Sequence, residues 1–93
     1  MGIKSLNSEQ IRLGKYLFDT FNNNPKAELN LTDVSQNLMF PEKRITKYLY
    51  TYFAGFFARK GSNIHFGTEF TIIDFEDHIK ILERAAGGLR ERL

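Results

Sequence analysis

The sequence predicts a small α+β domain that is mostly helical. Three observations predict this class: helical apolar periodicity in four segments, a proline turn between the second and third of them, and a glycine-punctuated run of β-forming residues before the last. With 93 residues, 42% of them hydrophobic and 26% charged, the chain supports one core of ordinary globular composition. We expect a domain over residues 1–73 and a C-terminal helix over residues 74–93, together forming one compact unit.

The N-terminal part predicts a helix followed by a short strand. Apolar side chains recur at three- and four-residue steps from Ile11 to Phe21, which indicates a helix over residues 8–22. Three asparagines and Pro25 end it, because asparagine tolerates left-handed geometry and proline cannot continue a helix. Weak alternation over residues 27–31 then favours a strand that pairs with a later hairpin.

The next segment predicts two helices joined by a tight turn. Thr32 is expected to cap a short helix in which Val34 and Leu38 face inward. Pro41 marks the turn, because the residue before a proline is pushed out of helical geometry and proline is tolerated at the first helical position. The following helix is expected over residues 41–54. The alternative interpretation is an ordinary helical hairpin.

The helix over residues 41–54 has two distinct faces. Ile45, Leu49 and Phe53 lie on its predicted inner stripe. The opposite face carries two lysines, a threonine hydroxyl and a tyrosine phenol, and an arginine lies at its rim. These candidate ligand-binding residues are Lys43, Lys47, Thr46 and Tyr50 on the face and Arg44 at the rim.

A β-hairpin is predicted next, with strands near residues 56–60 and 69–73 and a loop between them. Two turn signals compete for its tip, one at residues 60–63 and one at Gly67-Thr68. The polar residues of this loop form a second candidate binding set: Arg59, Lys60, Ser62, Asn63 and His65.

A final helix is expected from Asp74, which we expect to cap it. Its apolar positions step by four and three residues in alternation, as in a heptad seam, which favours homodimerisation through Phe75, Ile79, Leu82, Ala86, Leu89 and Leu93. A helix that packs on the core of its own chain is the alternative. Gly87-Gly88 weakens the helix, so a break or fraying is expected near residue 87.

Charge and residue types restrict the function. Residues 42–65 carry five basic side chains against one acidic, a net charge of +4, in a chain whose total is +2. This is where a phosphate backbone would need positive charge. The chain has no cysteine, and neither His65 nor His78 has a second ligand at metal spacing. Asp74, Glu76 and Asp77 suit the start of a helix better than a catalytic cluster. We therefore expect no catalysis, no cofactor and no metal.

Two stretches, LTDVSQNLMFPEKRITKYL at residues 31–49 and GFFARKG at residues 55–61, resemble the winged helix-turn-helix superfamily of small DNA-binding regulators. The resemblance extends over about residues 8–86. The layout is also similar to small archaeal plasmid and virus proteins, such as AspA-type centromere-binding proteins and PadR-like repressors. Two residues depart from the pattern: Met39 stands where the turn often has glycine, and Pro41 where serine or threonine commonly caps the next helix.

The resemblance implies a homodimer that binds specific double-stranded DNA sequences, most simply a transcriptional regulator. Centromere binding and spreading in plasmid partition, with other proteins of such a complex, is the first alternative. A protein–protein interaction module is the second. The helix over residues 41–54 would contact base edges and phosphates, the hairpin loop would contact the neighbouring backbone, and the amides of the helix beginning at Thr32 would hold a phosphate. No signal peptide or membrane span is visible, so we expect a cytoplasmic, nucleoid-associated protein without a membrane partner.

Overall fold

The computed structural model describes the backbone of residues 8–91 and the side chains of residues 9–85. The described residues form seven elements in chain order: α1 (Ser8–Asn23), β1 (Glu28–Asn30), α2 (Leu31–Leu38), α3 (Glu42–Thr51), β2 (Phe57–Lys60), β3 (Asn63–Phe66) and α4 (Ile72–Glu91). The α+β, mostly helical class predicted from the sequence is confirmed.

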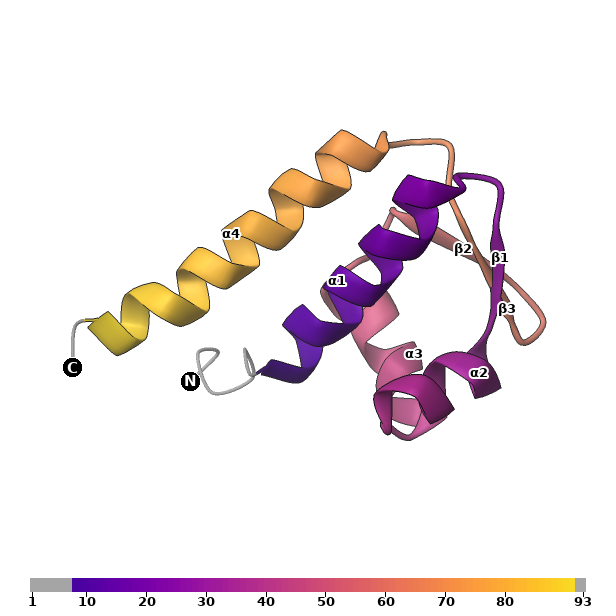
Figure 1. The fold of residues 1–93 in the computed structure, drawn as a ribbon, viewed down its shortest axis with the longest axis horizontal. Coiled ribbons are helices and arrows are strands. Elements are labelled where there is room, and N and C mark those ends of the chain that lie inside the picture. The colour runs from indigo at the N-terminus through magenta and orange to yellow at the C-terminus, as the bar shows by residue number, and fades with distance from the viewer. Residues whose placement is uncertain (1–7, 92–93) are drawn as a thin grey trace.

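The three strands form one antiparallel sheet in the order β1-β3-β2. Helices α1 and α4 run side by side, and the sheet lies at the opposite end of the molecule from the C-terminal end of α4 (Figure 1). On the central strand β3, Ile64 is fully buried, and its partner on β1 is Leu29. Because side chains alternate across a strand, His65 points to the other face of the sheet.

All four helices, strand β3 and the intervening loops contribute to one core. Its buried apolar residues are Leu13, Leu17, Phe21, Leu31, Val34, Leu38, Phe40, Ile45, Tyr48, Leu49, Phe53, Phe56, Ile64, Phe75 and Ile79. Phe75 of α4 lies at the centre of the aromatic part, with ring centroids 5.6 Å from Phe53, 5.1 Å from Phe56 and 5.0 Å from Phe57. Aromatic pairs at such separations stabilise a small core beyond their buried area. Helix α4 therefore belongs to the same core as residues 8–71.

Gly14 allows α1 to approach the rest of the core closely. A Cβ atom at this position would lie 3.1 Å from Cζ of Phe53 and 3.3 Å from Cγ1 of Ile79. Both neighbours are buried, so they have little room to move away. The glycine in the apolar pattern of α1 is thus explained by packing against the loop after α3 and against α4.

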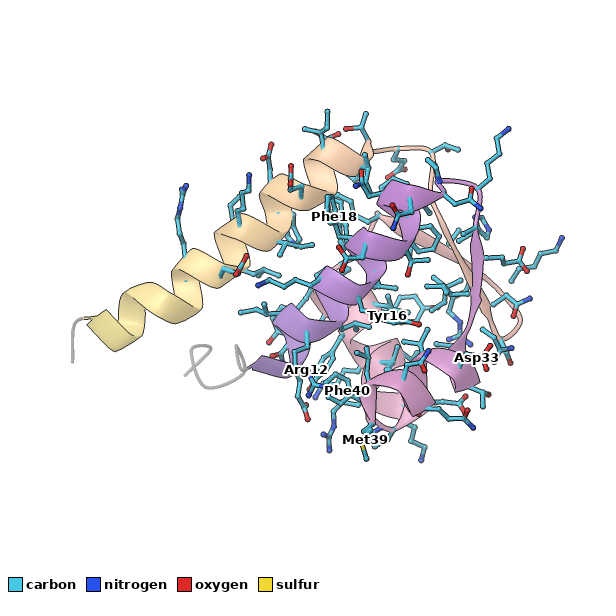
Figure 2. The ribbon with its side chains drawn as sticks, in the orientation of Figure 1. Arg12, Tyr16, Phe18, Asp33, Met39 and Phe40 are labelled. Atoms are coloured by element: carbon cyan, nitrogen blue, oxygen red, sulfur yellow. The ribbon has the colours of Figure 1, made fainter. Side chains whose placement is uncertain are left out.

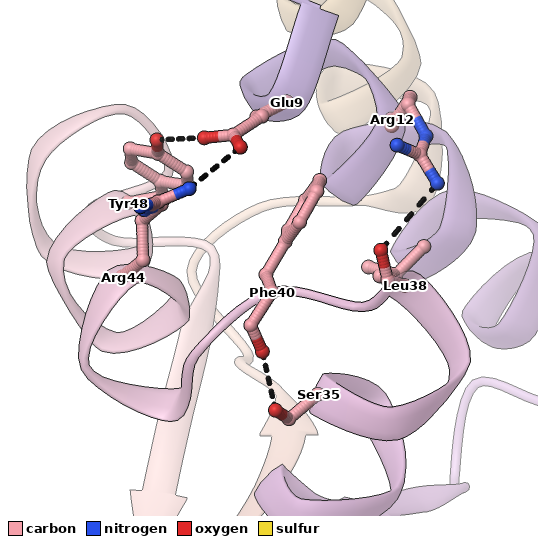
Figure 3. A network of polar contacts seen from close by, with 7 residues as sticks. All are labelled: Glu9, Arg12, Ser35, Leu38, Phe40, Arg44 and Tyr48. Atoms are coloured by element: carbon pink, nitrogen blue, oxygen red, sulfur yellow. Dashed lines mark hydrogen bonds and ion pairs between the residues drawn. The ribbon is translucent and has the colours of Figure 1, made fainter.

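The turn between α2 and α3 is confirmed, and both unusual residues in it have a structural role. Met39 adopts the left-handed conformation with φ of 62°, and its amide donates to the carbonyl of Ser35, in the manner of a helix C-cap. Pro41 stands just outside α3 as its N-cap residue, with φ of −62° and ψ of 145°. The hydroxyl of Ser35 also donates to the carbonyl of Phe40, which secures the turn (Figure 3).

The predicted strand over residues 69–73 is wrong. The hairpin is tighter: β2 and β3 are joined by the two-residue turn Gly61-Ser62, with φ of 66° at Gly61. A positive φ at the first residue of a two-residue turn matches the twist of antiparallel strands. Gly67, one of the two competing turn signals, instead closes the base of the hairpin, where its amide donates to the carbonyl of Phe56 at 2.7 Å.

Two predicted helix caps are also corrected. Asn30, not Thr32, caps α2, because its side-chain oxygen accepts a hydrogen bond from the amide of Thr32 at 2.9 Å. Helix α4 begins at Ile72, before Asp74. The amide of Thr71 donates to the carboxylate of Asp74 at 2.9 Å, and the amide of Asp74 donates to the hydroxyl oxygen of Thr71 at 3.1 Å. This reciprocal pair is a capping box.

The helix break expected near residue 87 is absent. Helix α4 continues through both glycines to Glu91. Each glycine destabilises the helix by roughly 1 kcal/mol relative to alanine, but this local cost does not determine where the helix ends.

Candidate nucleic-acid interface

Helix α3 has one face in the core and one in solvent. Ile45, Leu49 and, just after the helix, Phe53 are buried, which confirms the inner stripe predicted for these positions. Tyr48 is buried beside them. Lys43 and Lys47 are exposed, and the exposed fraction of Tyr50 is 64%. The fourth candidate on this face, Thr46, is only half-buried. Three of the four residues predicted to face outward, Lys43, Lys47 and Tyr50, are thus open to solvent, and Thr46 is partly covered.

Arg44 differs from the lysines beside it. Its guanidinium contacts the Glu9 carboxylate of α1 at 2.7 Å, and the other oxygen of that carboxylate accepts a hydrogen bond from the hydroxyl of Tyr48, also at 2.7 Å (Figure 3). Burial, followed by the hydrogen bond to Glu9, raises the pKa of Tyr48 to about 12. Arg44 therefore ties α3 to α1, and its charge is balanced inside the molecule.

The hairpin residues divide in the same way. Lys60 and Ser62 are exposed, and Arg59 is exposed while donating to the carbonyl of Gly61 at 3.1 Å. The amide side chain of Asn63, however, donates to Glu28 at 2.6 Å and accepts from Asn30 at 3.2 Å.

Asn63 therefore links β1 to β3, and its side-chain amide is already hydrogen-bonded through both its nitrogen and its oxygen. His65 is half-buried on the outer face of the sheet.

The contacts at the start of α2 argue against the predicted phosphate site at Thr32. The amide of Leu31 donates to the carbonyl of Ser62 at 2.8 Å, and the amide of Thr32 is occupied by the Asn30 cap. The Thr32 hydroxyl donates to the carboxylate of Glu42 at 3.2 Å. A phosphate here would meet a negative charge and find two amides already bonded.

The same contacts bring three segments of the chain together. Through Leu31 and Ser62 the hairpin turn touches the start of α2, and through Thr32 and Glu42 the start of α2 touches the start of α3. The hairpin turn and the first turn of α3 therefore lie at one edge of the molecule.

Sequence reasoning missed two residues that shape this region. Glu9 holds Arg44 across 35 positions of sequence, a separation that no local pattern reveals. Arg12 places its guanidinium 5.1 Å from the centre of the Phe40 ring and donates to the carbonyl of Leu38 at 3.4 Å. Neither contact has a local signal in the sequence, because the residues it joins are 35 and 26 positions apart.

The predicted dimer seam is corrected at its first two positions. Phe75 and Ile79 are 0% and 5% exposed, because they pack into the core of their own chain. Leu82 is half-buried against the same core. The other three predicted interface residues, Ala86, Leu89 and Leu93, lie outside the residues whose side chains are described. The heptad spacing thus reflects packing within the chain over at least its first turns.

Comparisons with protein-family models, with curated proteins and with solved structures found no match. Within residues 8–91, none of the helices combines the length and the apolar character required to cross a membrane. The described side chains include no group of three or more histidine, aspartate or glutamate residues placed to hold a metal ion.

Proposed function

We propose that this chain is a winged helix-turn-helix protein that binds double-stranded DNA with α3 and the β2–β3 hairpin. The order of the elements, the tight turn before α3 and the sheet order β1-β3-β2 are those expected of that fold. In it, α3 would enter the major groove and the hairpin turn would lie against the neighbouring backbone.

The observation that carries the proposal is the placement of uncompensated cations at one edge. Lys43 and Lys47 project from the outer face of α3, and Lys60 precedes the hairpin turn that is bonded to the start of α2. Among the described residues, none of these three lysines makes an ion pair. Lysines that have no internal partner can neutralise phosphates and release counterions from DNA, which supplies most of the affinity for a duplex.

The exposed face of α3 would also read sequence. Lysine donates to guanine, while threonine and tyrosine hydroxyls contact either bases or phosphate oxygens. Lys47, Thr46 and Tyr50 are the residues we assign to base edges. Lys43, on the first turn, is assigned to a flanking phosphate.

A duplex titration at several salt concentrations tests the proposal. The double variant Lys43→Ala/Lys60→Ala should bind more weakly, and the slope of log affinity against log salt should fall by about 1.8, because each phosphate that a lysine neutralises adds roughly 0.9 to the slope. The matched control is Lys15→Ala/Lys80→Ala, which removes the same charge from lysines that are paired with Glu83 and Glu76 on α4. Equal slopes in the two double variants would contradict the assigned surface.

Footprinting would distinguish the two roles considered for DNA binding, transcriptional regulation and plasmid partition. Protection of one isolated palindrome favours a transcriptional regulator, because a symmetric dimer reads two half-sites about one helical turn apart. Progressive coverage along the duplex favours a role in plasmid partition. The homodimer itself remains a prediction, which sedimentation of the native chain would test.

A protein–protein interaction module is the second candidate, and one observation favours it. Met39, in the turn before α3, is 88% exposed and lies at the outer edge of the molecule (Figure 2), and Tyr50 is also open to solvent. A protein partner could bury these two side chains. A native chain that shows no salt-dependent duplex binding would favour this candidate.

A further inference from the structure

A groove of about 470 Å³ lies outside the surface assigned to α3. It is lined by residues of the loop before β1, of all three strands and of the segment after β3: Pro25, Lys26, Glu28, Lys60, His65, Phe66, Gly67 and Thr68. Volumes of this order are typical of sites for small ligands.

The polar side chains of the groove are arranged around His65. In the register of the sheet, His65 on the central strand is paired with Glu28 of β1 on one side and with Ala58 of β2 on the other. Lys26 precedes β1, and Lys60 ends β2, so the two lysines come from opposite sides of the central strand. A ligand over His65 would have an ammonium group on each side.

The charges of this groove are not balanced internally. Neither Lys26 nor Lys60 has an ion-pair partner among the described residues. The single carboxylate in the lining, Glu28, has one oxygen directed to the side-chain amide of Asn63 at 2.6 Å. Two ammonium groups, the imidazole and the hydroxyl of Thr68 make the groove suited to an anion with several acceptor oxygens.

The backbone that carries these groups is fixed by hydrogen bonds. The amide of Lys26 donates to the side-chain oxygen of Asn24 at 3.2 Å, and the amide of Ala27 donates to the carbonyl of Asn24 at 3.0 Å. On the other side, the bond from Gly67 to Phe56 closes the hairpin base. A site whose backbone is already ordered loses less entropy when a ligand binds.

We infer that this groove is a phosphate-binding site in which Lys26, Lys60 and His65 donate to the phosphate oxygens. Two sources supply that chemistry. One is the backbone of the bound duplex, in which case the DNA contact extends from the hairpin turn across the outer face of the sheet; this source rests on the proposed function. The other is a free phosphorylated small molecule.

The first arm of the test uses inorganic tripolyphosphate with the full chain and no DNA, followed by NMR. Saturable shifts should concentrate on the His65 ring and on the amides of Lys26, Gly67 and Thr68. Lys26→Gln should weaken this binding several-fold, and the matched control Lys80→Gln, on α4, should leave it unchanged. Glu28→Gln removes the negative charge while keeping an acceptor for Asn63, so it should tighten binding.

Shifts spread over all exposed lysines, or equal binding by the Lys26→Gln and Lys80→Gln variants, would overturn the inference.

The second arm measures the salt dependence of duplex binding for the Lys26→Gln variant. A slope lower by about 0.9 identifies the DNA backbone as the source of the phosphate. An unchanged slope, together with tripolyphosphate binding at the groove, identifies a free phosphorylated ligand and still supports the site. If the native chain binds duplex but tripolyphosphate does not reach the groove and the slope is unchanged, the groove inference fails alone. If tripolyphosphate binds and no duplex does, the DNA-binding proposal fails alone.

Discussion

Lys43 and Arg44 are adjacent cations on α3, but they belong to different surfaces. Arg44 lies on the side toward α1 and is held by Glu9 at 2.7 Å, whereas Lys43 lies on the outer side without an ion-pair partner among the described residues. The net charge of +4 over residues 42–65 counts both equally. The difference shows that a local charge sum overstates the cations available to a ligand, because one of them is neutralised by a residue 35 positions away.

The largest effect on stability should come from truncating a buried side chain of α3. Ile45 is fully buried, so Ile45→Ala should lower the free energy of unfolding by about 2–5 kcal/mol, through reduced apolar burial and the cavity left behind. Lys47→Ala, on the exposed face, should change it by less than about 0.5 kcal/mol. Urea denaturation of both variants measures the contrast, and a similar decrease in both would mean that the two faces are not distinct.

An intermediate effect should appear at high pH on the side of α3 toward α1. Because the pKa of Tyr48 is raised to about 12 from the ordinary tyrosine value of 10.0, folding favours its neutral form. The contribution of this group to the free energy of unfolding is complete below about pH 10. It is lost as the pH rises toward 12, with a magnitude on the order of 2–3 kcal/mol. The native chain should therefore lose more stability between about pH 10 and pH 12 than the Tyr48→Phe variant does, as urea denaturation at each pH would show. Parallel pH profiles would remove Tyr48 from this role.

The smallest effects should separate the two neighbouring cations. Arg44→Ala should cost about 1 kcal/mol or less of stability, since the ion pair is partly exposed, and should leave the salt slope of duplex binding unchanged. Lys43→Ala should leave stability unchanged and lower the slope by about 0.9. Thermal unfolding and a duplex titration on the same two variants measure both quantities. A lower slope for Arg44→Ala would show that DNA competes with Glu9 for this residue.

The sequence predicted local features well and the hairpin less well. Helical periodicity located all four helices, and Pro41 located the turn, because both signals depend on neighbours within about four residues. The second strand of the hairpin was misplaced because two glycine signals were locally equivalent. The hydrogen bond from the Gly67 amide to the Phe56 carbonyl places Gly67 at the base of the hairpin. Gly61 is at the tip, between β2 and β3.

The amino-acid sequence by itself determined the α+β class, the order of the elements and the outward face of α3, since these follow from apolar spacing and turn chemistry along the chain. The tertiary structure alone decided which polar groups are available. Glu9 forms an ion pair with Arg44, and Glu42 accepts a hydrogen bond from Thr32. Asn63 is hydrogen-bonded to both Glu28 and Asn30. It also decided that Phe75 belongs to the core of its own chain. These assignments depend on contacts between residues distant in sequence, which no periodicity along the chain encodes.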